Sequence, residues 1–486
     1  MSAAMVGVEP RPVNIEVMIT PSGRAYTAFR IVGLPDAAVR ESCERVRSAI
    51  MRQGYRFPDG RVVVSLGPAG IPKVGTVYDL PIALAILAAS LDDPIDFAPF
   101  VAVGELSLDG SVRPVASTLA ALDVARGVDR RCLVPHSSPV PPRWTSHLAG
   151  VQTLGEAVAV ARGVFDGRQV EATPAPALTG PDLAHVKGQT RARRALEIAA
   201  AGGHHLLMSG PPGAGKTLMA RTLPSVLPPL TASEQREVAL IGSVVGSTIH
   251  GDRPPFRAPH HSASTAALVG GGIGIPKPGE VTRAHRGVLF LDELGEFPPA
   301  SIDALRQPLE DGTVTVARSV ETVQFPARLQ LVAATNPCPC GYDGDRRRPC
   351  SCTDAAKARY RSKLSGPLVD RFDLRITVPR LPLTPTDTDH DSEGSDIVRR
   401  RVEAARERQR ARGGLNRELS GSELDAEPFV DGAVQVLRRA AESEALTGRG
   451  WDRVRRVART IADLAGVERI DGTHVEEALD LRLGVA

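Results

Sequence analysis

Aromatic residues and lysines are scarce in this chain of 486 residues. It has only 11 Phe, 5 Tyr and 2 Trp, so its cores must be built from Ala, Val, Leu and Ile. Lysine accounts for 6 of the 59 basic residues, an excess of arginine that is more typical of GC-rich coding than of a recognition function. The 56 acidic residues reduce the net charge to +3. So small a net charge does not by itself indicate a nucleic-acid partner.

Long apolar segments are also missing. The longest, Leu80 to Leu91, has 12 residues and contains Pro81, which is too short for a bilayer span. The start MSAAMVGVEPRPVNIEV has neither the basic region nor the apolar core of a secretion signal. Six cysteines in so long a chain argue against a disulfide framework. We therefore expect a cytoplasmic protein that has no membrane partner.

Two polar segments divide the chain. A length of 486 residues corresponds to about three domains at roughly 150 residues each. The proline-rich stretch 169–182 and the acidic stretch 381–395 are interpreted as linkers. The predicted domains are 1–168, 183–380 and 396–486. The middle one alternates short apolar strands with helices, which predicts an α/β fold with a parallel sheet, and the last one is predicted to be helical.

The strongest motif is a phosphate loop. Residues 210–217, GPPGAGKT, match G-x-x-x-x-G-K-[ST] at every fixed position, between an apolar strand and a helix. The glycines let backbone amides wrap the phosphates of ATP, Lys216 reaches the β and γ oxygens, and Thr217 binds Mg²⁺. The predicted ATP-binding residues of this loop are Gly210, Pro211, Pro212, Gly213, Ala214, Gly215, Lys216 and Thr217.

Two further apolar strands end in polar residues. VLFLDE, residues 288–293, ends in Asp292, which would hold the Mg²⁺ shell, and Glu293, which would polarise the attacking water. LVAATN ends in Asn336, whose amide can orient the same water, the role called sensor 1. Together with the phosphate loop, these strand ends predict an AAA+ ATPase core.

Arginines are the predicted contacts to developing phosphate charge. Arg371 lies between two acids, and in a ring an arginine at this edge would reach the γ-phosphate of the neighbouring subunit. A surface ion pair with Asp370 or Asp373 is the alternative. In the last segment four arginines follow one side of a predicted helix, and one of them is expected to touch the nucleotide. They are Arg449, Arg453, Arg456 and Arg459.

Six motifs together resemble the magnesium-chelatase-like AAA+ family typified by ComM and YifB. They are GPPGAGKT, FRAPHHSAS, GEVTRAHRGVLFLDEL, ATNPCPCGY, SGPLVDRFDL and RVARTIADL, and the resemblance spans essentially the whole chain. It implies catalytic roles for Glu293, Asn336 and Arg371 and places the lid sensor at Arg449, with Arg456 as its rival. It also implies a homohexamer that hydrolyses ATP and drives branch migration of DNA. A chelatase-like ATPase that remodels a protein partner is the alternative.

Two insertions extend this resemblance. Phe256 to Lys277 lies where related ATPases place an insertion, and Asp311 to Leu329 alternates like a hairpin around Arg318. In that wider clade both elements point into the pore of the ring. Lys277 and Arg318 are therefore the predicted contacts to the DNA backbone.

Four cysteines form a C-x-C-x9-C-x-C arrangement: Cys338, Cys340, Cys350 and Cys352. Four thiolates in a loop of about 15 residues suit tetrahedral zinc. The C-x-C spacing is tighter than the usual one, so reduced thiols that pack a loop and a redox switch stay open beside structural zinc. His260 and His261 have no third ligand at zinc spacing, and we interpret them as structural or pore residues.

The first segment resembles the proteolytic domain of Lon, an α+β fold of the S5 type. The resemblance rests on IPKVGTVY and FVAVGELSLDGSVRPV. Lon requires a serine nucleophile and a lysine base. The matching positions hold Val77 and Leu119, so we predict no protease activity and a role in binding or ring building.

Overall fold

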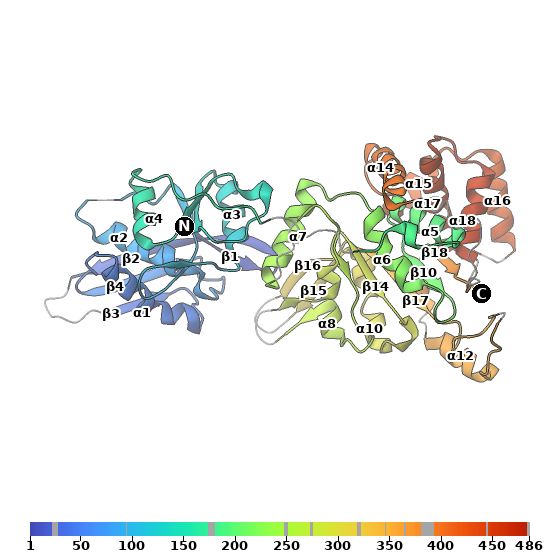
Figure 1. Ribbon diagram of the computed structural model, residues 1–486, viewed down its shortest axis with the longest axis horizontal. Helices are drawn as coiled ribbons and strands as arrows, with labels where there is room; N and C mark the ends of the chain where they lie inside the picture. Colours follow the sequence, from blue (N-terminus) through green and yellow to red (C-terminus); the bar gives the residue numbers. More distant parts are fainter. Residues whose placement is uncertain are drawn as a thin grey trace. The chain divides into compact units, whose positions relative to one another are not determined.

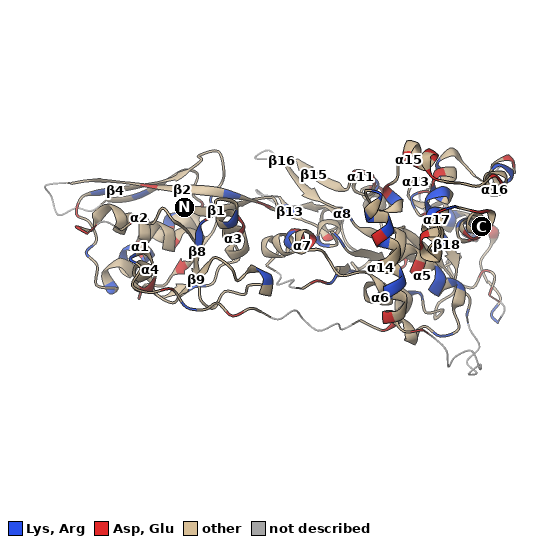
Figure 2. Cartoon of the chain, turned by 90° about the horizontal axis from the view of Figure 1, so that it is seen from above, with Lys and Arg blue, Asp and Glu red and all other residues tan. Residues whose placement is uncertain are grey.

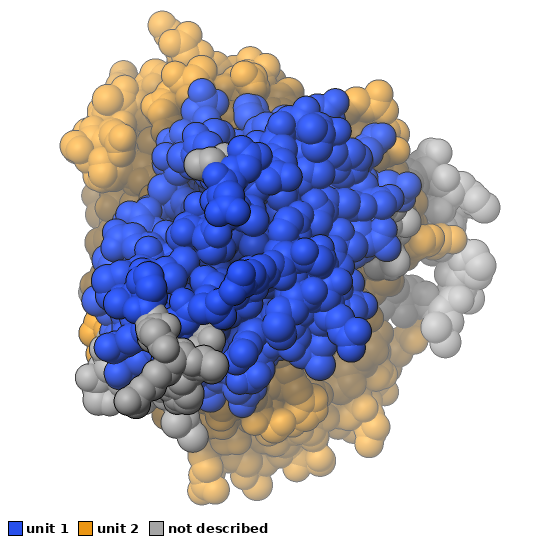
Figure 3. Space-filling model, turned by 90° about the vertical axis from the view of Figure 1, so that its left-hand side faces the viewer, with its two compact units in different colours: residues 1–176, 235–251 blue, residues 177–234, 252–486 orange. Residues whose placement is uncertain are grey.

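The chain folds into two compact units, which Figure 1 shows as ribbons and Figure 3 as coloured surfaces. Unit 1 comprises Met1–Pro176 and Gln235–Gly251, and unit 2 comprises Ala177–Glu234 and Asp252–Ala486. No described helix is long and apolar enough to cross a membrane. The computed structural model describes residues 1–21, 28–93, 95–173, 180–246, 251–272, 276–317, 322–345, 347–363, 366–380, 393–443 and 446–483.

Unit 1 contains a mixed sheet of order β1-β2-β4-β3 and a parallel sheet of order β5-β8-β9. In the mixed sheet only β3 and β4 pair in parallel. A short antiparallel pair, β6 with β7, lies in the sequence between β5 and β8 of the parallel sheet. The strands are β1 (Ser2–Val6), β2 (Glu9–Thr20), β3 (Ala28–Val32), β4 (Arg61–Gly67), β5 (Phe100–Ala102), β6 (Glu105–Leu106), β7 (Val112–Arg113), β8 (Arg131–Pro135) and β9 (Leu148–Val151).

A helix that is apolar on all sides forms the centre of unit 1. This helix, α2 (Asp79–Ser90), buries nearly all of its first turns, and its buried Asp79 is paired with Arg45 at 2.7 Å. Such a helix is stable only inside a core. The other helices of this unit are α1 (Ala37–Arg52), α3 (Thr118–Gly127), α4 (Leu154–Ala161) and most of α7 (Ala232–Val244).

The two positions that match the Lon dyad are apolar and buried. Val77 and Leu119 are both part of the hydrophobic core of unit 1. Lys73, the nearest lysine in the sequence, is fully buried and donates to the carbonyl oxygen of Pro68. The hydroxyl of Thr76 donates to Glu105 at 2.6 Å. The described hydrogen bonds of Lys73 and Thr76 therefore go to a backbone carbonyl oxygen and to a carboxylate.

Unit 2 is built on a parallel sheet of order β11-β14-β17-β10-β18, which confirms the predicted parallel sheet. Its three central strands, β14, β17 and β10, are short and wholly buried, as their apolar sequences predict. The helices α5 and α6 pack beside it (Figure 1). The bounds are β10 (Leu206–Ser209), β11 (Phe256–Arg257), β14 (Val288–Leu291), β17 (Gln330–Thr335), β18 (Leu374–Thr377), α5 (Thr190–Gly202) and α6 (Lys216–Val226).

The last segment is helical, as predicted, and its helices share a core with α5 and the sheet. The longest, α17, ends at Gly466, whose φ of +75° suits a residue without a side chain. Its apolar face packs on α14 and α18. The helices of this lid are α14 (Ser395–Ala411), α15 (Gly421–Ala426), α16 (Asp431–Glu442), α17 (Gly448–Ala465) and α18 (Gly472–Leu483).

Short elements connect the strands of unit 2. The first predicted insertion contains a small ladder, in which Gly270 pairs with Pro278. The second is the predicted hairpin, in which Val316 pairs with Val323. These elements are α8 (Thr265–Val269), β12 (Gly270–Gly271), β13 (Lys277–Pro278), α9 (Glu280–Arg283), α10 (Pro299–Asp303), α11 (Arg306–Asp311), β15 (Thr313–Ala317), β16 (Thr322–Pro326), α12 (Asp354–Lys363) and α13 (Gly366–Val369).

Candidate active site

The phosphate loop connects β10 to α6. Gly210 has no room for a side chain, because a Cβ there would lie 2.2 Å from the carbonyl oxygen of Val378. Gly213 and Gly215 have φ angles of +78° and +89°, which only glycine adopts without steric cost. No described side chain caps the amino terminus of α6, so its backbone amides are available to an anion.

Lys216, the first residue of α6, is largely buried in the loop. Its amino group donates to the carbonyl oxygens of Gly210 and, at 3.1 Å, of Pro211. It also donates to the amide oxygen of Asn336 at 3.2 Å. Burial lowers its pKa to about 8, although the charge of Asp292 limits the fall. A bound phosphate would supply the anion that keeps this amine charged.

Thr217 and Asp292 connect the phosphate loop to β14. The hydroxyl of Thr217 donates to a carboxylate oxygen of Asp292 at 2.7 Å. Because Asp292 follows a parallel strand, its carboxylate lies at the same edge of the sheet as the loop after β10. A hydroxyl and a carboxylate are oxygen ligands of the kind that Mg²⁺ prefers. The two residues therefore fit the ion that accompanies ATP.

Asn336 lies between these groups because β17 pairs with both β10 and β14. The three strands are parallel, so their carboxyl ends meet at one edge, which we call the carboxyl edge. Two hydrogen bonds, from Lys216 to Asn336 and from Thr217 to Asp292, thus hold these predicted residues at one edge. A glycine-rich loop, a hydroxyl–carboxylate pair and an amide therefore lie together at this edge.

Glu293 has a different partner from its neighbour Asp292. Its backbone is left-handed, with φ 52° and ψ 49°, and its side chain is 54% exposed. One carboxylate oxygen lies 3.4 Å from Nδ1 of His261. The interpretation of His261 as a structural or pore residue did not include this contact. Its position four residues after β11, the neighbour of β14, is the signal that could have revealed it.

Arg371 lies away from the carboxyl edge, between α13 and β18. It donates to the carbonyl oxygen of Pro367 at 2.6 Å and forms an ion pair with Glu310. The predicted alternative was an ion pair with a sequence neighbour, but Asp370 pairs with Arg375 at 3.3 Å and Asp373 is buried. Arg371 is therefore in an ion pair, but its partner is Glu310.

A buried carboxylate, that of Asp373, connects the lid to the edge of the sheet at which the strands begin. Asp373 lies 3.4 Å from both Arg453 and His204, and His204 bonds in turn to Thr460 of α17 at 2.8 Å. Burial acts to raise the pKa of Asp373, but the hydrogen bond to His204 and the charge of Arg453 hold it below its ordinary value. The ionised carboxylate thus anchors α17 beside the start of β18.

Five arginines line one pocket at this edge. Its walls include His205 and Leu329, which immediately precede β10 and β17, so we call it the amino edge. Arg456 donates to the carbonyl oxygen of Leu419 at 2.8 Å. Arg449, the lid sensor that the resemblance implies first, is exposed and does not line this pocket. The five arginines are Arg328, Arg371, Arg417, Arg453 and Arg456.

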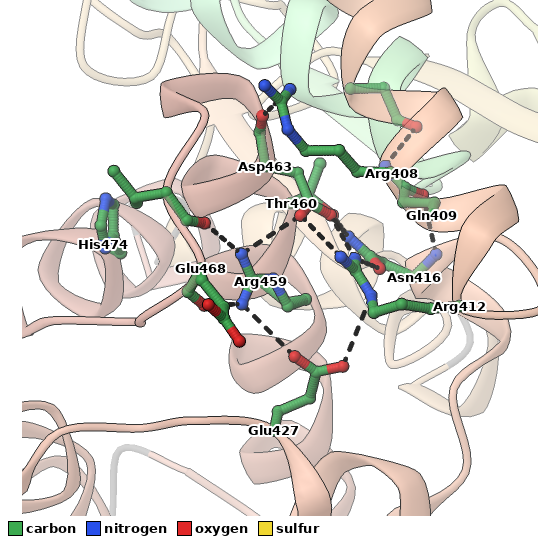
Figure 4. Close-up of polar contacts among 12 residues, drawn as sticks. Arg408, Gln409, Arg412, Asn416, Glu427, Arg459, Thr460, Asp463, Glu468 and His474 are labelled. Atoms are coloured by element: carbon green, nitrogen blue, oxygen red, sulfur yellow. Dashed lines mark hydrogen bonds and ion pairs between the residues drawn. The ribbon is translucent and has the colours of Figure 1, made fainter.

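Arg459, the fourth arginine on α17, belongs to the core of the lid (Figure 4). It is 1% exposed and pairs with Asp463 at 3.1 Å and Glu427 at 3.3 Å. From α14, Arg412 pairs with the same two carboxylates at 2.5 and 3.6 Å. Two acids shared by two arginines form a closed, neutral network, so Arg459 has a structural role rather than a nucleotide contact.

The four predicted cysteines form a cluster whose sulfur atoms all lie within 4.8 Å of one another. Cys338 and Cys340 are 3.3 Å apart, and each lies 3.6 Å from Cys350. Sulfur ligands of a tetrahedral zinc, at about 2.3 Å from the metal, are about 3.8 Å apart. A backbone hydrogen bond from Tyr342 lowers the pKa of Cys340 to about 5, which favours a thiolate. The cluster is compatible with zinc.

The cysteine loop packs against the phosphate loop. A Cβ at Gly341 would lie 2.6 Å from the Pro212 ring, so only glycine fits there. Arg380 donates to the carbonyl oxygen of Pro212 at 2.7 Å and lies over the ring of Tyr342. Because Cys338 follows Asn336 by two residues, the position of the cluster determines that of the amide.

The structure describes only one of the two predicted DNA contacts. Lys277 is exposed in β13, whereas Arg318 lies outside the described residues. Basic residues are also frequent on the lid helices α14 and α17 (Figure 2). Half of the arginines on α14 are paired with acids, as Arg401 is with Glu393 at 2.7 Å. Lys277 is therefore the described residue on which the predicted DNA contact rests.

Comparisons with known families match three consecutive parts of the chain. The family described as "Magnesium chelatase, subunit ChlI" matches residues 182–385. "Subunit ChlI of Mg-chelatase" matches residues 15–138, and "Magnesium chelatase, subunit ChlI C-terminal" matches residues 392–482. The core, the first unit and the lid thus all have counterparts under one family description.

Several relatives match over nearly their full length. An uncharacterised protein of Mycobacterium tuberculosis is 44% identical over 99% of this chain and 97% of its own. Competence protein ComM of Haemophilus influenzae is 41% identical over 99% and 96%, and YifB of Salmonella typhimurium is 40% identical over 99% and 96%. Lon protease 2 of Bacillus subtilis is 33% identical over 156 residues, which are 30% of this chain and 28% of that protein.

Proposed function

Because this chain belongs to the ComM/YifB family of magnesium-chelatase-like AAA+ proteins, we propose that it is an ATP-hydrolysing homohexamer that moves branched or single-stranded DNA. One observation carries the proposal. The groups that bind phosphate and magnesium lie at one edge of the sheet in unit 2, and the arginines that could complete the reaction lie at the other.

The residues at the carboxyl edge divide the work of hydrolysis. The loop amides and Lys216 hold the phosphates, while Thr217 and Asp292 hold Mg²⁺, which neutralises phosphate charge when bound. Glu293 accepts a proton from the attacking water, and Asn336 orients that water. The hydrogen bonds of Lys216 and Thr217 support the first two roles, and the chemistry of a carboxylate and an amide supports those of Glu293 and Asn336.

The amino edge supplies positive charge to a neighbouring subunit in this proposal. The strand β10 has four residues, which at about 3.3 Å per residue separate the two edges by roughly 13 Å. That distance is too long for Arg371 to reach the γ-phosphate held by its own chain. In a ring, the pocket of five arginines faces the next subunit's nucleotide, and Arg456 or Arg453 takes the part of the lid sensor.

DNA is the proposed substrate because the full-length relatives include a competence protein. Lys277 in the first insertion and Arg318 in the second supply the contacts to its phosphates. The descriptions of all three matched families favour the alternative substrate, a protein partner remodelled by a chelatase-like ATPase. Stimulation of hydrolysis by DNA distinguishes the two.

Unit 1 is proposed to be a Lon-like α+β domain without protease activity. The partial match to a Lon protease supports the likeness. The proposed lack of protease activity rests on Val77 and Leu119, which have neither a hydroxyl nor an amine. Its proposed work is to bind a partner or to hold the ring together.

Zinc is the proposed metal of the cysteine cluster. Four sulfurs within 4.8 Å supply a complete tetrahedral set, which is typical of a structural site because it leaves no position open for substrate. The contact of Gly341 with Pro212 gives the metal a place beside the nucleotide. Its role is to hold in place the cysteine loop, which begins directly after Asn336.

The direct test is the rate of ATP hydrolysis with and without forked DNA. The proposal expects Mg²⁺-dependent hydrolysis that forked DNA accelerates, together with strand movement on that substrate. Hydrolysis that DNA leaves unchanged but a protein partner accelerates would support the alternative. A protein that fails to hydrolyse ATP under any of these conditions would contradict the motor.

A further inference from the structure

A second pocket at the amino edge lies where the lid meets the core of unit 2, and we call it the lid–core pocket. Five arginines and two glutamates line it, which leaves a net charge of +3 around a volume of about 220 Å³. Such an excess of positive charge in a small concave space favours an anionic ligand. The arginines are Arg286, Arg328, Arg406, Arg410 and Arg417, and the glutamates are Glu234 and Glu418.

The lid and the core both contribute arginines to this pocket. From the lid, Arg406 and Arg410 are four residues apart on one face of α14, and Arg417 lies in a short turn after that helix. From the core, Arg286 precedes β14 by two residues, and Arg328 precedes β17 by two. Because these strands are parallel neighbours, both arginines come to the amino edge. A ligand in the pocket would therefore contact both parts of the unit.

Arg406 is held by a carbonyl oxygen rather than by a carboxylate. Its Nε and Nη2 donate to the carbonyl oxygen of Ala200 at 2.9 and 2.7 Å. No acid among the described residues forms an ion pair with it, and burial and the charge of Arg410 lower its pKa to about 10. The side chain thus stays charged at neutral pH. Two of its five N–H groups are used, so the others remain for a ligand.

Arg417 is fixed in a similar way. Its Nη1 donates to the carbonyl oxygen of Leu329 at 2.8 Å, and its Nη2 lies 4.0 Å from a carboxylate oxygen of Glu418. The side chain is 19% exposed, and burial lowers its pKa. Carbonyl oxygens orient a guanidinium without neutralising it. Arg406 and Arg417 therefore present positioned charge that an anion would compensate.

The glutamates of the pocket leave this charge in place. One carboxylate oxygen of Glu234 accepts hydrogen bonds from the amide and the hydroxyl of Thr231, each at 2.9 Å. The other oxygen lies 3.5 Å from Arg286. Glu234 is thus committed to Thr231 and Arg286, and Glu418 is 47% exposed to solvent. Neither acid closes an ion pair with Arg406.

Gln330 adds a buried acceptor to the wall of the pocket. It is 6% exposed, and its Nε2 donates to the carbonyl oxygens of Ala199 and His204 at 3.0 and 2.8 Å. Its Oε1 has no hydrogen-bond partner among the described residues, so a protonated phosphate oxygen of a ligand would supply the missing donor. The volume of 220 Å³ corresponds to about seven molecules of liquid water, which suits a small ligand rather than a polymer.

We propose that the lid–core pocket binds a small ligand that carries a diphosphate group and that this ligand ties the lid to the core. The oxygens of the diphosphate accept hydrogen bonds from Arg406 and Arg417 of the lid and from Arg328 of the core. This site is separate from the nucleotide site, because the length of β10 lies between the amino edge and the phosphate loop. Binding here does not require the proposed motor.

The test uses the full-length protein with inorganic pyrophosphate as the probe, in saturating ADP so that the phosphate loop is occupied. Titration calorimetry should show one further binding site per chain. Pyrophosphate should also raise the melting temperature, since a ligand that binds only the folded state stabilises it. Arg406→Met should weaken the affinity about tenfold or more, the loss expected for a hydrogen bond between charged groups.

Two further variants on α14 separate the pocket from the general charge of the helix. Arg410→Gln changes an exposed arginine of the pocket and should weaken pyrophosphate binding about threefold. Arg400→Met changes an exposed arginine that does not line the pocket, and it should keep the wild-type affinity. If Arg406→Met does not fold, the difference between Arg410→Gln and Arg400→Met decides the question.

Three results would overturn the inference. Binding that disappears once ADP is present would place pyrophosphate in the phosphate loop alone. Equal losses of affinity in the pocket variants and in Arg400→Met would contradict a specific site. If single-stranded DNA displaces pyrophosphate and Arg406→Met weakens both equally, the pocket binds nucleic acid and the small ligand is wrong. A protein that binds pyrophosphate as predicted but does not hydrolyse ATP would contradict only the proposed function.

Discussion

The two edges of the sheet in unit 2 hold complementary groups. The carboxyl edge combines glycine-rich backbone, a threonine, two acids and an amide, with Lys216 as the cation among them. The amino edge gathers five arginines, several of which already face carboxylates, as Arg371 does Glu310. Among the described residues that line it, the first offers Lys216 as its cation within the phosphate loop. The second has further cations but no phosphate loop.

This difference indicates how the chain must work. A strand of four residues is too long for a side chain to bridge, so the two edges of one subunit do not meet. In the proposed ring, the amino edge of one subunit faces the carboxyl edge of the next.

The largest effect is expected at the carboxyl edge, from Glu293→Gln. Loss of a general base costs about 100-fold or more in turnover, while the phosphate contacts that bind ATP remain. ATP affinity should therefore be close to that of the wild type. Glu296→Gln changes an exposed acid three residues away and serves as the control. Wild-type turnover in Glu293→Gln would show that this acid does not activate the water.

The second effect separates the arginines of α17 by burial. Arg459→Met leaves Glu427 and Asp463 short of a partner, and breaking such a buried pair costs about 3–5 kcal/mol in the free energy of unfolding. Arg449→Met, on the exposed start of the same helix, should change it by less than about 0.5 kcal/mol. Denaturant unfolding of the lid measures both, and equal values would contradict the structural role of Arg459.

How far the sequence predicts these two edges depends on how each is built. Every residue of the carboxyl edge follows a strand within a short motif, so the spacing alone identifies Lys216, Asp292 and Asn336. The parallel sheet and the helical lid are predicted from the same local patterns. Helix periodicity, by contrast, puts Arg459 on one side of α17 with the other arginines. It cannot show that Glu427 and Arg412 enclose it, because those residues come from distant segments.

The same limit applies to His261. Its position after β11 is visible in the sequence, but the contact to Glu293 depends on which strands are neighbours. The partner of Arg371 is likewise a tertiary fact, since Glu310 lies 61 residues away, whereas Asp370 and Asp373 are close in the sequence. Motifs identify the chemistry of a strand end, and the packing of separate elements determines what that end touches.

A third effect concerns the cysteine loop that follows Asn336. Chelation, or Cys350→Ser, should release about one zinc per chain and lower the melting temperature, because metal binding contributes to folding. Turnover should fall with it, since the loop that bears Cys338 packs on Pro212 through Gly341. Cys43→Ser, in unit 1, is the control and should keep the metal. Protein expressed with ample zinc under reducing conditions that contains none would contradict the site.

The smallest effect is expected from the two predicted DNA contacts. Lys277→Ala combined with Arg318→Ala should leave DNA-free hydrolysis unchanged but lose DNA stimulation and strand movement. Each lost phosphate contact should reduce the slope of log affinity against log salt by about 1. Lys187→Ala removes an exposed cation elsewhere and should change neither quantity. An unchanged salt slope in the double variant would mean that both are solvated surface charges.

Mixing two inactive variants tests most directly whether the two edges complete each other. Lys216→Ala disables the carboxyl edge of a subunit, and Arg371→Ala disables its amino edge. In an equal mixture about one quarter of the interfaces pair an intact loop with an intact arginine, so the account predicts about a quarter of wild-type hydrolysis. ATP hydrolysis that stays absent at every mixing ratio would contradict a site shared between subunits.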